Sequence, residues 1–251
     1  MDAFDEFTKG PLTLEEQIKI ISLLENPEEA ERVRKSLRFY EVPTRLKNPD
    51  NYKWGDLKSS LHVMFHYANP QNEYEFNEML KLIDGKSSLL EIGSNFGGTL
   101  KRMASVMKPG STIVSVDLPL DNTPPFLNPQ ASLKVSCQQI SWMGAEVELF
   151  IGNSHSPEVK EAVGQYGPFD VVFIDGDHSY EGVKQDWEDY GPMGRIVGFH
   201  DICDVKSLDG KNELGCHRFW EELKAEGKYK TDEFIDFDSP RRFGIGIVYR
   251  E

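Results

Sequence analysis

Residues 88–119 read SLLEIGSNFGGTLKRMASVMKPGSTIVSVDLP, and this stretch decides the fold. The apolar run at 89–92 is typical of a short strand buried in a parallel sheet. Three closely spaced glycines let the chain turn sharply and bring its backbone near a ligand: Gly93, Gly97 and Gly98. The pattern therefore predicts a strand that ends in a ligand-binding turn.

The second half of the stretch predicts a helix and another strand. Apolar residues recur at helical spacing over residues 99–108, and Pro109-Gly110 ends that pattern. Residues 112–116 favour a strand that runs into Asp117. A strand, a glycine turn, a helix and a second strand with an acid at its tip form the unit that holds an adenosine ribose.

Two residues of this unit indicate which cofactor it binds. A dinucleotide site requires G-x-G-x-x-G, but Asn95 occupies the middle glycine position counted from Gly93. Glu91, just before the turn, would repel a pyrophosphate but suits a ligand with a cationic amino-acid end. The run E-x-G-S-x-x-G-G resembles the first motif of class I S-adenosylmethionine-dependent methyltransferases.

That resemblance implies a set of cofactor contacts. Glu91 is expected near the methionine end of S-adenosylmethionine, and Asp117 on the ribose hydroxyls. The turn between them is expected to line the cofactor through Gly93, Ser94, Asn95, Gly97 and Gly98. Ser154, at the end of a later strand, is either a further cofactor contact or a turn residue that starts the next helix.

The composition limits the kinds of partner. The chain has 251 residues and a formal net charge of −14, and so acidic a surface disfavours nucleic acid as a substrate. No apolar run is long enough to span a membrane, and the acidic N-terminus lacks the pattern of a signal peptide. The three cysteines have no C-x-x-C spacing, so they indicate neither a disulfide scaffold nor structural zinc. We therefore expect a cytoplasmic protein.

The periodicity of the rest of the chain predicts an α/β fold. Strands are expected at 147–151, 170–174, 196–199, 229–235 and 243–249, with the strand at 196–199 the shortest. Helices are expected at 71–83, 131–143, 156–166, 180–190 and 213–226. Alternating strands and helices imply a mostly parallel, Rossmann-like sheet, and the last two strands an antiparallel hairpin. The methyltransferase resemblance implies seven strands in this arrangement.

The length suits one such domain with an extension. We predict an N-terminal helical extension at 1–70 and the S-adenosylmethionine-binding domain at 71–251. The N-terminal helices could pack between subunits, so a homo-oligomer is possible.

A second group of residues falls at the carboxyl ends of the later strands, where open parallel sheets bind ligands. Asp175, Asp177 and His178 follow one strand, and His200 and Asp201 follow the next. Clustered carboxylates repel one another unless a cation lies among them, and oxygen ligands suit magnesium. Asp175 and Asp201 are the best candidate ligands, with His200 a possible third. Asp177 is an alternative that could instead cap the helix starting near Ser179.

The runs FIDGDHSYEGVKQDW and GFHDI sharpen the resemblance. They are similar to the metal-dependent O-methyltransferases grouped with macrolide-sugar methyltransferases and cephalosporin-hydroxylase-like proteins. The resemblance implies that Asp175 and Asp201 hold magnesium, with Asp175 also beside the cofactor, and that His178 is the general base. Relatives often carry another acid at the position of His200, which leaves the identity of the ion open.

These observations predict a magnesium-dependent O-methyltransferase that acts on a hydroxyl of a small molecule, such as a sugar or glycosylated metabolite. A cation lowers the pKa of a bound hydroxyl, and an imidazole of ordinary pKa can accept its proton at neutral pH. Two alternatives stay open. His178, His200 and Asp175 could form the iron site of an oxygenase, or the protein could bind the cofactor without catalysis.

Overall fold

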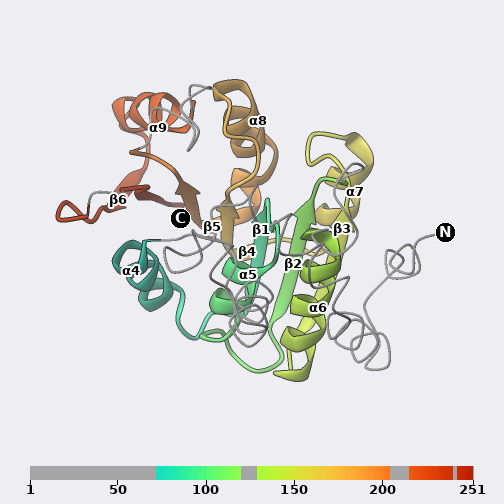
Figure 1. The fold of residues 1–251 in the computed structure, drawn as a ribbon. Coiled ribbons are helices and arrows are strands. Elements are labelled where there is room, and N and C mark those ends of the chain that lie inside the picture. The colour runs from blue at the N-terminus through green and yellow to red at the C-terminus, as the bar shows by residue number, and fades with distance from the viewer. Residues whose placement is uncertain (1–71, 120–128, 204–214, 240–241, 251) are drawn as a thin grey trace, which may run out of the picture. The chain divides into compact units, whose positions relative to one another are not determined.

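The computed structural model describes residues 72–119, 129–203, 215–239 and 242–250 (Figure 1). The predicted helical extension at 1–70 lies outside the described residues, and its boundary at residue 71 stays a prediction. Among the described residues, no helix combines the length and the apolar character needed to cross a membrane.

Seven strands form one sheet in the order β3-β2-β1-β4-β5-β7-β6. β1 to β5 pair in parallel, whereas β7 pairs antiparallel with both β5 and β6. This arrangement confirms the predicted methyltransferase sheet with its terminal hairpin. The strands are β1 (Ser88–Ile92), β2 (Thr112–Asp117), β3 (Glu146–Ile151), β4 (Phe169–Ile174), β5 (Gly194–His200), β6 (Lys230–Phe234) and β7 (Ile245–Tyr249).

The helices follow the predicted alternation with the strands. They are α4 (Glu73–Ile83), α5 (Gly98–Ala104), α6 (Pro129–Trp142), α7 (Pro157–Gly164), α8 (Tyr180–Tyr190), the short 3₁₀ helix η6 (Gly191–Met193) and α9 (Cys216–Ala225). Side chains cap three of them, since Asn72, Ser156 and Ser179 each accept a hydrogen bond from a first-turn amide. Helix α5 ends at Ala104, before the predicted stop at Pro109-Gly110.

The described residues belong to two compact units. One unit comprises 72–94, 102–119 and the described residues from 140 onward, and it contains the entire sheet. The described part of the other unit is 95–101 and 129–139. Within that second unit, the Ser136 hydroxyl donates a 3.1 Å hydrogen bond to the Phe96 carbonyl.

The core on one face of the sheet combines alternate strand residues with α7, α8 and α9. Leu90, Val172 and Val197 stand in register on β1, β4 and β5, and all three are fully buried. Their cluster includes residues from each of the three helices: Val163, Val183 and Phe219. Burial on this scale explains why these strands read as continuous apolar runs.

The opposite face packs against α4. Phe76 of α4 meets Phe173 of β4 edge to face, with ring centroids 6.4 Å apart. A side chain at Gly198 would lie only 2.8 Å from the ring of Phe173, so this glycine makes room for the aromatic pair. Tyr74 is exposed, whereas the neighbouring Glu75 is buried and accepts amide hydrogen bonds from Asp236 and Gly244.

The prediction that the strand at 196–199 is the shortest in the sheet is wrong. Strand β5 has seven residues, and the other strands have five or six. It starts at Gly194, which pairs with Phe169, and a Cβ there would lie 2.7 Å from a methyl of Val172. Glycine has a weak strand preference, so the pattern misses a residue that close packing against β4 requires.

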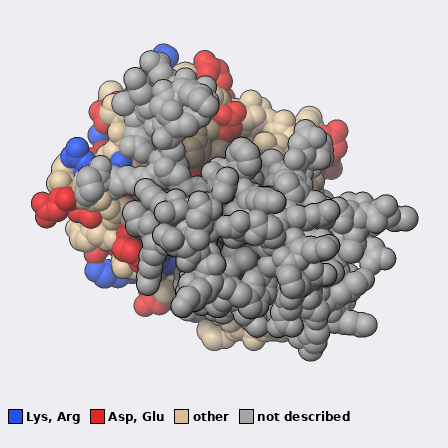
Figure 2. Space-filling view, in the orientation of Figure 1, with Lys and Arg blue, Asp and Glu red and all other residues tan. Residues whose placement is uncertain are grey.

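The described surface is mixed in charge on the face shown in Figure 2. Acidic and basic side chains lie interspersed there, and the described residues of this face form no extended basic patch. This distribution is consistent with the acidic composition of the chain.

Candidate functional site

The carboxyl ends of β1, β4 and β5 bring three chain segments side by side. Ile92 pairs with Ile174, which in turn pairs with Phe199. The residues that follow these strand ends therefore emerge together at one edge of the sheet, as expected for the binding edge of an open parallel sheet.

Gly93 is required where β1 leaves the sheet. Its φ of 87° lies in the left-handed region, and a Cβ there would lie 2.1 Å from the carbonyl oxygen of Asp175. The chain after β4 runs this close because the Asp175 amide donates a 2.9 Å hydrogen bond to the Ile92 carbonyl. The glycine turn thus places Asp175 directly beside the end of β1.

Asp175, His200 and Asp201 converge behind this turn. The Nδ1 atom of His200 lies 3.1 Å from Oδ1 of Asp175 and 3.1 Å from Oδ1 of Asp201. Their side chains are 6–8% exposed. Asp201 has a φ of 59°, a left-handed conformation that is uncommon for residues other than glycine and that is enriched at functional sites.

His178 lies beside the two carboxylates and is one-third exposed. Its Nδ1 is 2.9 Å from Oδ2 of Asp201, and its Nε2 is 3.3 Å from Oδ1 of Asp175. The structure therefore brings together all four residues predicted for metal binding and base catalysis. Asp177, the alternative ligand, is exposed and accepts a hydrogen bond from the Ser179 amide, so it shapes the start of α8.

The close contact among these four side chains shifts the pKa of each of them. Burial would lower the pKa of His178, but its hydrogen bonds to Asp175 and Asp201 and their negative charges raise it to about 10. Burial would likewise lower the pKa of His200, and the same carboxylates hold it well above its ordinary value. The pKa values of Asp175 and Asp201 are lowered because the imidazolium charges outweigh the effect of burial.

The ordinary imidazole pKa expected for His178 from the sequence is therefore wrong for the cluster without a cation. These shifts favour the protonated form of both imidazoles, whose positive charge offsets the two carboxylates. A protonated imidazole cannot act as a general base.

The donor set fits a metal ion. One ligand atom from each of Asp175, His200 and Asp201 lies within 4.8 Å of the others. Nε2 of His200 is buried and has no hydrogen-bond partner among the described residues, and Nδ1 faces only the two carboxylate oxygens 3.1 Å away. A buried nitrogen and two buried carboxylate oxygens that converge in this way are the arrangement that a coordinated cation satisfies.

The residues predicted to bind the cofactor occupy the expected strand ends and turn. Glu91 is fully buried in β1, and the buried Ser94 accepts a 2.7 Å hydrogen bond from the Ser115 hydroxyl. Asp117 ends β2, where its Oδ1 accepts a hydrogen bond from the Leu118 amide.

The rest of the predicted turn has the backbone that its sequence suggests. Asn95 has a φ of 48° and Gly97 a φ of 79°, both left-handed. A Cβ at Gly97 would lie 2.6 Å from the Ser136 Cβ, so that position needs glycine, and Gly98 begins α5.

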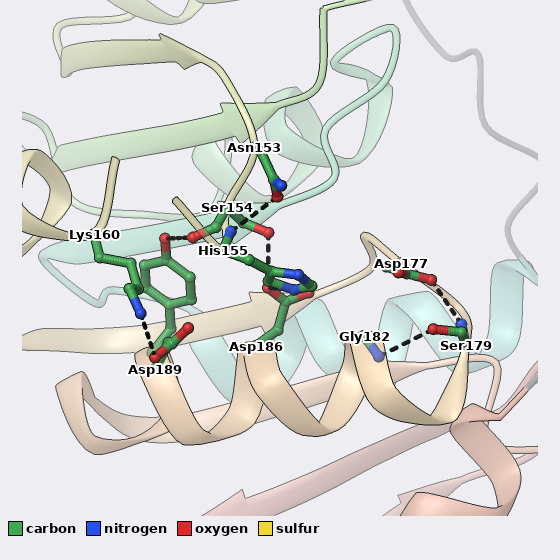
Figure 3. Close-up of polar contacts among 10 residues, drawn as sticks. Asn153, Ser154, His155, Lys160, Asp177, Ser179, Gly182, Asp186 and Asp189 are labelled. Atoms are coloured by element: carbon green, nitrogen blue, oxygen red, sulfur yellow. Dashed lines mark hydrogen bonds and ion pairs between the residues drawn. The ribbon is translucent and has the colours of Figure 1, made fainter. Parts of the chain in front are cut away.

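Ser154 belongs to a polar network that sequence reasoning missed. Its hydroxyl donates a 2.8 Å hydrogen bond to Oδ1 of Asp186 in α8, and Nε2 of His155 lies 3.1 Å from the same oxygen (Figure 3). The Tyr190 hydroxyl donates a 2.6 Å hydrogen bond to the Ser154 carbonyl. Two side chains one helical turn apart therefore hold the end of β3.

Asp186 is fully buried, and burial raises its pKa to about 6 despite the Ser154 hydrogen bond and the nearby His155. One sequence signal could have found it. Asp186 follows Val183 by three residues and precedes Tyr190 by four, and this spacing places it on the buried face of α8.

The comparisons with known proteins agree with this geometry. Residues 90–202 match a family model described as a methyltransferase domain. No curated protein sequence matches the chain. Among solved structures, it is similar to the O-methyltransferase from Bacillus cereus in complex with SAH, with a TM-score of 0.56 and 16% identity over 87% of this chain and 97% of that one. It is also similar to the O-methyltransferase TomG from Streptomyces achromogenes, which is involved in tomaymycin synthesis and was solved in complex with SAM. The TM-score is 0.52 and the identity 14%, over 92% of this chain and 94% of that one.

Residues 90–202 therefore resemble a methyltransferase domain, and the predicted Rossmann-like methyltransferase fold is confirmed. Identities of 14% and 16% show a shared fold and not a shared substrate.

Proposed function

We propose that this protein transfers the methyl group of S-adenosylmethionine to a hydroxyl oxygen of a small molecule, with a divalent cation at Asp175, His200 and Asp201. The observation that carries the proposal is the convergence of these three side chains at the edge of a methyltransferase sheet. The O-methyltransferases of similar fold support hydroxyl oxygen as the acceptor atom.

The cofactor would occupy the glycine turn. Glu91 supplies a buried negative charge for the cationic methionine end, and Asp117 supplies carboxylate oxygens for the ribose hydroxyls. Ser94, Asn95, Gly97 and Gly98 continue this turn. Ser154 would reach the cofactor through its backbone, since its hydroxyl donates to Asp186.

The acceptor would lie beside His178. A cation at the three ligands supplies the charge that lowers the pKa of an acceptor hydroxyl. Such a charge also offsets the two carboxylates that hold the proton on His178, so the imidazole becomes able to take the acceptor's proton. Asp201 would orient the ring through its 2.9 Å contact with Nδ1, and Nε2, which lies 3.3 Å from Oδ1 of Asp175, would accept the proton once the cation holds that oxygen.

The substrate class rests on the sequence resemblance to macrolide-sugar methyltransferases. A sugar or glycosylated metabolite presents hydroxyls that need activation, whereas the acidic chain disfavours nucleic acid.

The iron-oxygenase alternative fits the geometry less well, although His178 and His200 both lie near Asp175. Such sites use two histidines and one carboxylate, whereas the converging ligands are one histidine and two carboxylates.

Radiolabelled S-adenosylmethionine and a panel of sugar and phenol acceptors test the proposal. We expect label transfer that chelation abolishes and a divalent cation restores. Asp175→Asn and Asp201→Asn should lose activity while they keep most of their affinity for S-adenosylhomocysteine in calorimetry, because the main expected cofactor contacts lie at the ends of β1 and β2. Full activity after complete chelation would contradict the role of the cation.

A further inference from the structure

The ligand atoms at the ends of β4 and β5 are chemically mixed. Asp175 and Asp201 offer carboxylate oxygens, and His200 offers an imidazole nitrogen 3.1 Å from each of them. Resting on the proposed function, we propose that this centre selects a divalent first-row transition-metal ion, such as Mn²⁺, over Mg²⁺, and that His200 is the residue that sets this selectivity.

The chemistry of the donor set carries the selectivity. Imidazole nitrogen is a good ligand for transition-metal ions, whereas Mg²⁺ prefers carboxylate, carbonyl and water oxygens. Mg²⁺ also loses its water reluctantly, so a nitrogen that replaces an oxygen at its site weakens binding. One histidine among two carboxylates therefore moves the preference toward the transition metals.

The ring of His200 is held in place by its neighbours. It stacks on the ring of Phe243 with centroids 5.5 Å apart and an interplanar angle of 29°. On β4, the ring of Phe173 lies 6.3 Å away. The side chain is 6% exposed and sits on a strand paired on both sides, so it cannot turn away from the carboxylates. A Mg²⁺ ion would have to accept the nitrogen or lose a ligand position.

The spacing of the donors suits direct coordination. Octahedral ligands about 2.1 Å from an ion stand about 3.0 Å apart when they are adjacent. The two separations of 3.1 Å from His200 Nδ1 are close to this value, and all three ligand atoms lie within 4.8 Å of one another. The site therefore needs little rearrangement to bind an ion through all three residues.

His178 has a different relation to the centre. Its Nδ1 contacts Oδ2 of Asp201, the oxygen that does not face His200, and its Nε2 lies 3.3 Å from Oδ1 of Asp175, outside the group of three converging ligand atoms. An imidazole bonded to the outer oxygen of a ligating carboxylate fixes that carboxylate rather than coordinating the ion. His200 is thus the nitrogen donor, and His178 provides a matched control.

The test uses the metal-depleted full-length protein. Calorimetric titrations with MnCl₂ and with MgCl₂ give the affinity ratio for the wild type, for His200→Asp and for His178→Gln. We expect the wild type to prefer Mn²⁺, and His200→Asp to reduce that preference by about tenfold or more because it restores an all-oxygen site. His178→Gln should weaken both ions alike and keep the ratio. Asparagine, which also offers an oxygen ligand but carries no charge to bury, replaces aspartate at this position if the first variant does not fold.

Pulsed electron paramagnetic resonance of the Mn²⁺-loaded protein gives a readout independent of activity. A coupling from a directly bound nitrogen is expected in the wild type and in His178→Gln, and it should vanish in the His200 variants. A wild-type ion with no bound nitrogen, an unchanged ratio in His200→Asp, or failure to bind either ion overturns the inference. Calorimetry with S-adenosylhomocysteine then shows separately whether the methyltransferase proposal survives.

Discussion

The hydroxyl of Ser154 donates a 2.8 Å hydrogen bond to the buried carboxylate of Asp186, which ties the end of β3 to α8. Nε2 of His155 contacts the same carboxylate oxygen, and the other oxygen has no hydrogen-bond partner among the described residues. The carboxylate is therefore buried with incomplete compensation, and its proton affinity becomes part of the stability of the fold.

The first prediction is that Asp186 lowers stability as the pH rises from about 4 to about 6. Its folded pKa of about 6 exceeds the unfolded value of about 3.9, so within this window the folded state binds more protons. Stability is then highest when the group is protonated and falls by up to about 3 kcal/mol as it ionises.

Urea unfolding of wild type and Asp186→Asn at several pH values measures this effect. The variant keeps the shape of the side chain and an acceptor for the Ser154 hydroxyl. Its free energy of unfolding should therefore increase relative to that of the wild type as the pH rises. A difference that stays constant from pH 4 to 7 would show that the carboxylate does not titrate in this range.

The second prediction concerns the other contact from α8 to the same turn. Tyr190→Phe removes the hydroxyl that donates to the Ser154 carbonyl and leaves the ring in the core. We expect a loss of about 0.5–1.5 kcal/mol in the free energy of unfolding, with a matching loosening of the turn. Tyr166→Phe is the matched control, because that ring packs edge to face on Phe150. Equal costs in the two variants would argue against a specific role for the Tyr190 hydroxyl.

The fold was largely predictable because its signals are local. The run 112–117 and the helix Tyr180–Tyr190 have the limits that their patterns indicate. The role of Asp186 was not predictable in the same way. In YEGVKQDWEDY it stands among several charged residues, and only its position relative to β3 makes it a buried partner of Ser154.

The candidate site was likewise predictable from the sequence only in part. Strand ends indicated that Asp175, His200 and Asp201 would meet, because register and parallel pairing follow from the fold. The raised pKa of His178 was not predictable, since it depends on distances of 2.9 and 3.3 Å to two side chains from different loops.

The third prediction is that His178→Ala reduces the methyl-transfer rate by about 10²- to 10⁴-fold, the range of a general base. The assay needs saturating cation, because loss of the contact to Asp201 should also weaken the metal by about 10- to 100-fold. Affinity for S-adenosylhomocysteine should be unchanged. A rate within about threefold of wild type, far below the general-base range, would leave the cation as the sole activator.

The fourth prediction is that Glu91→Gln weakens S-adenosylhomocysteine binding by about 10- to 100-fold, the scale of one charge-assisted hydrogen bond. Glu91 is fully buried at the glycine turn, where an ammonium group gains most from a carboxylate. Glu148→Gln, on the exposed side of β3, is the control and should bind normally. The wild type should bind NAD far more weakly than S-adenosylhomocysteine, and tight NAD binding would contradict the cofactor assignment.

The last prediction separates two reasons for the glycine at position 93. Gly93 and Gly85 both have left-handed φ values, 87° and 70°. A Cβ at Gly93 would lie 2.1 Å from the backbone oxygen of Asp175, whereas a Cβ at Gly85 would have no atom within 4 Å. Gly85→Ala should therefore cost only the backbone strain of about 1–2 kcal/mol.

Gly93→Ala should cost about 3 kcal/mol or more, because β1 and the chain after β4 must also move apart. That movement displaces Asp175, so metal affinity should fall together with stability, and it should remain normal in Gly85→Ala. Urea unfolding and Mn²⁺ titration of both variants measure the two effects. Equal destabilisation by the two substitutions would mean that β1 and the chain after β4 can move apart at little cost in free energy. In that case the close approach of Gly93 to Asp175 would not be what positions the metal ligand.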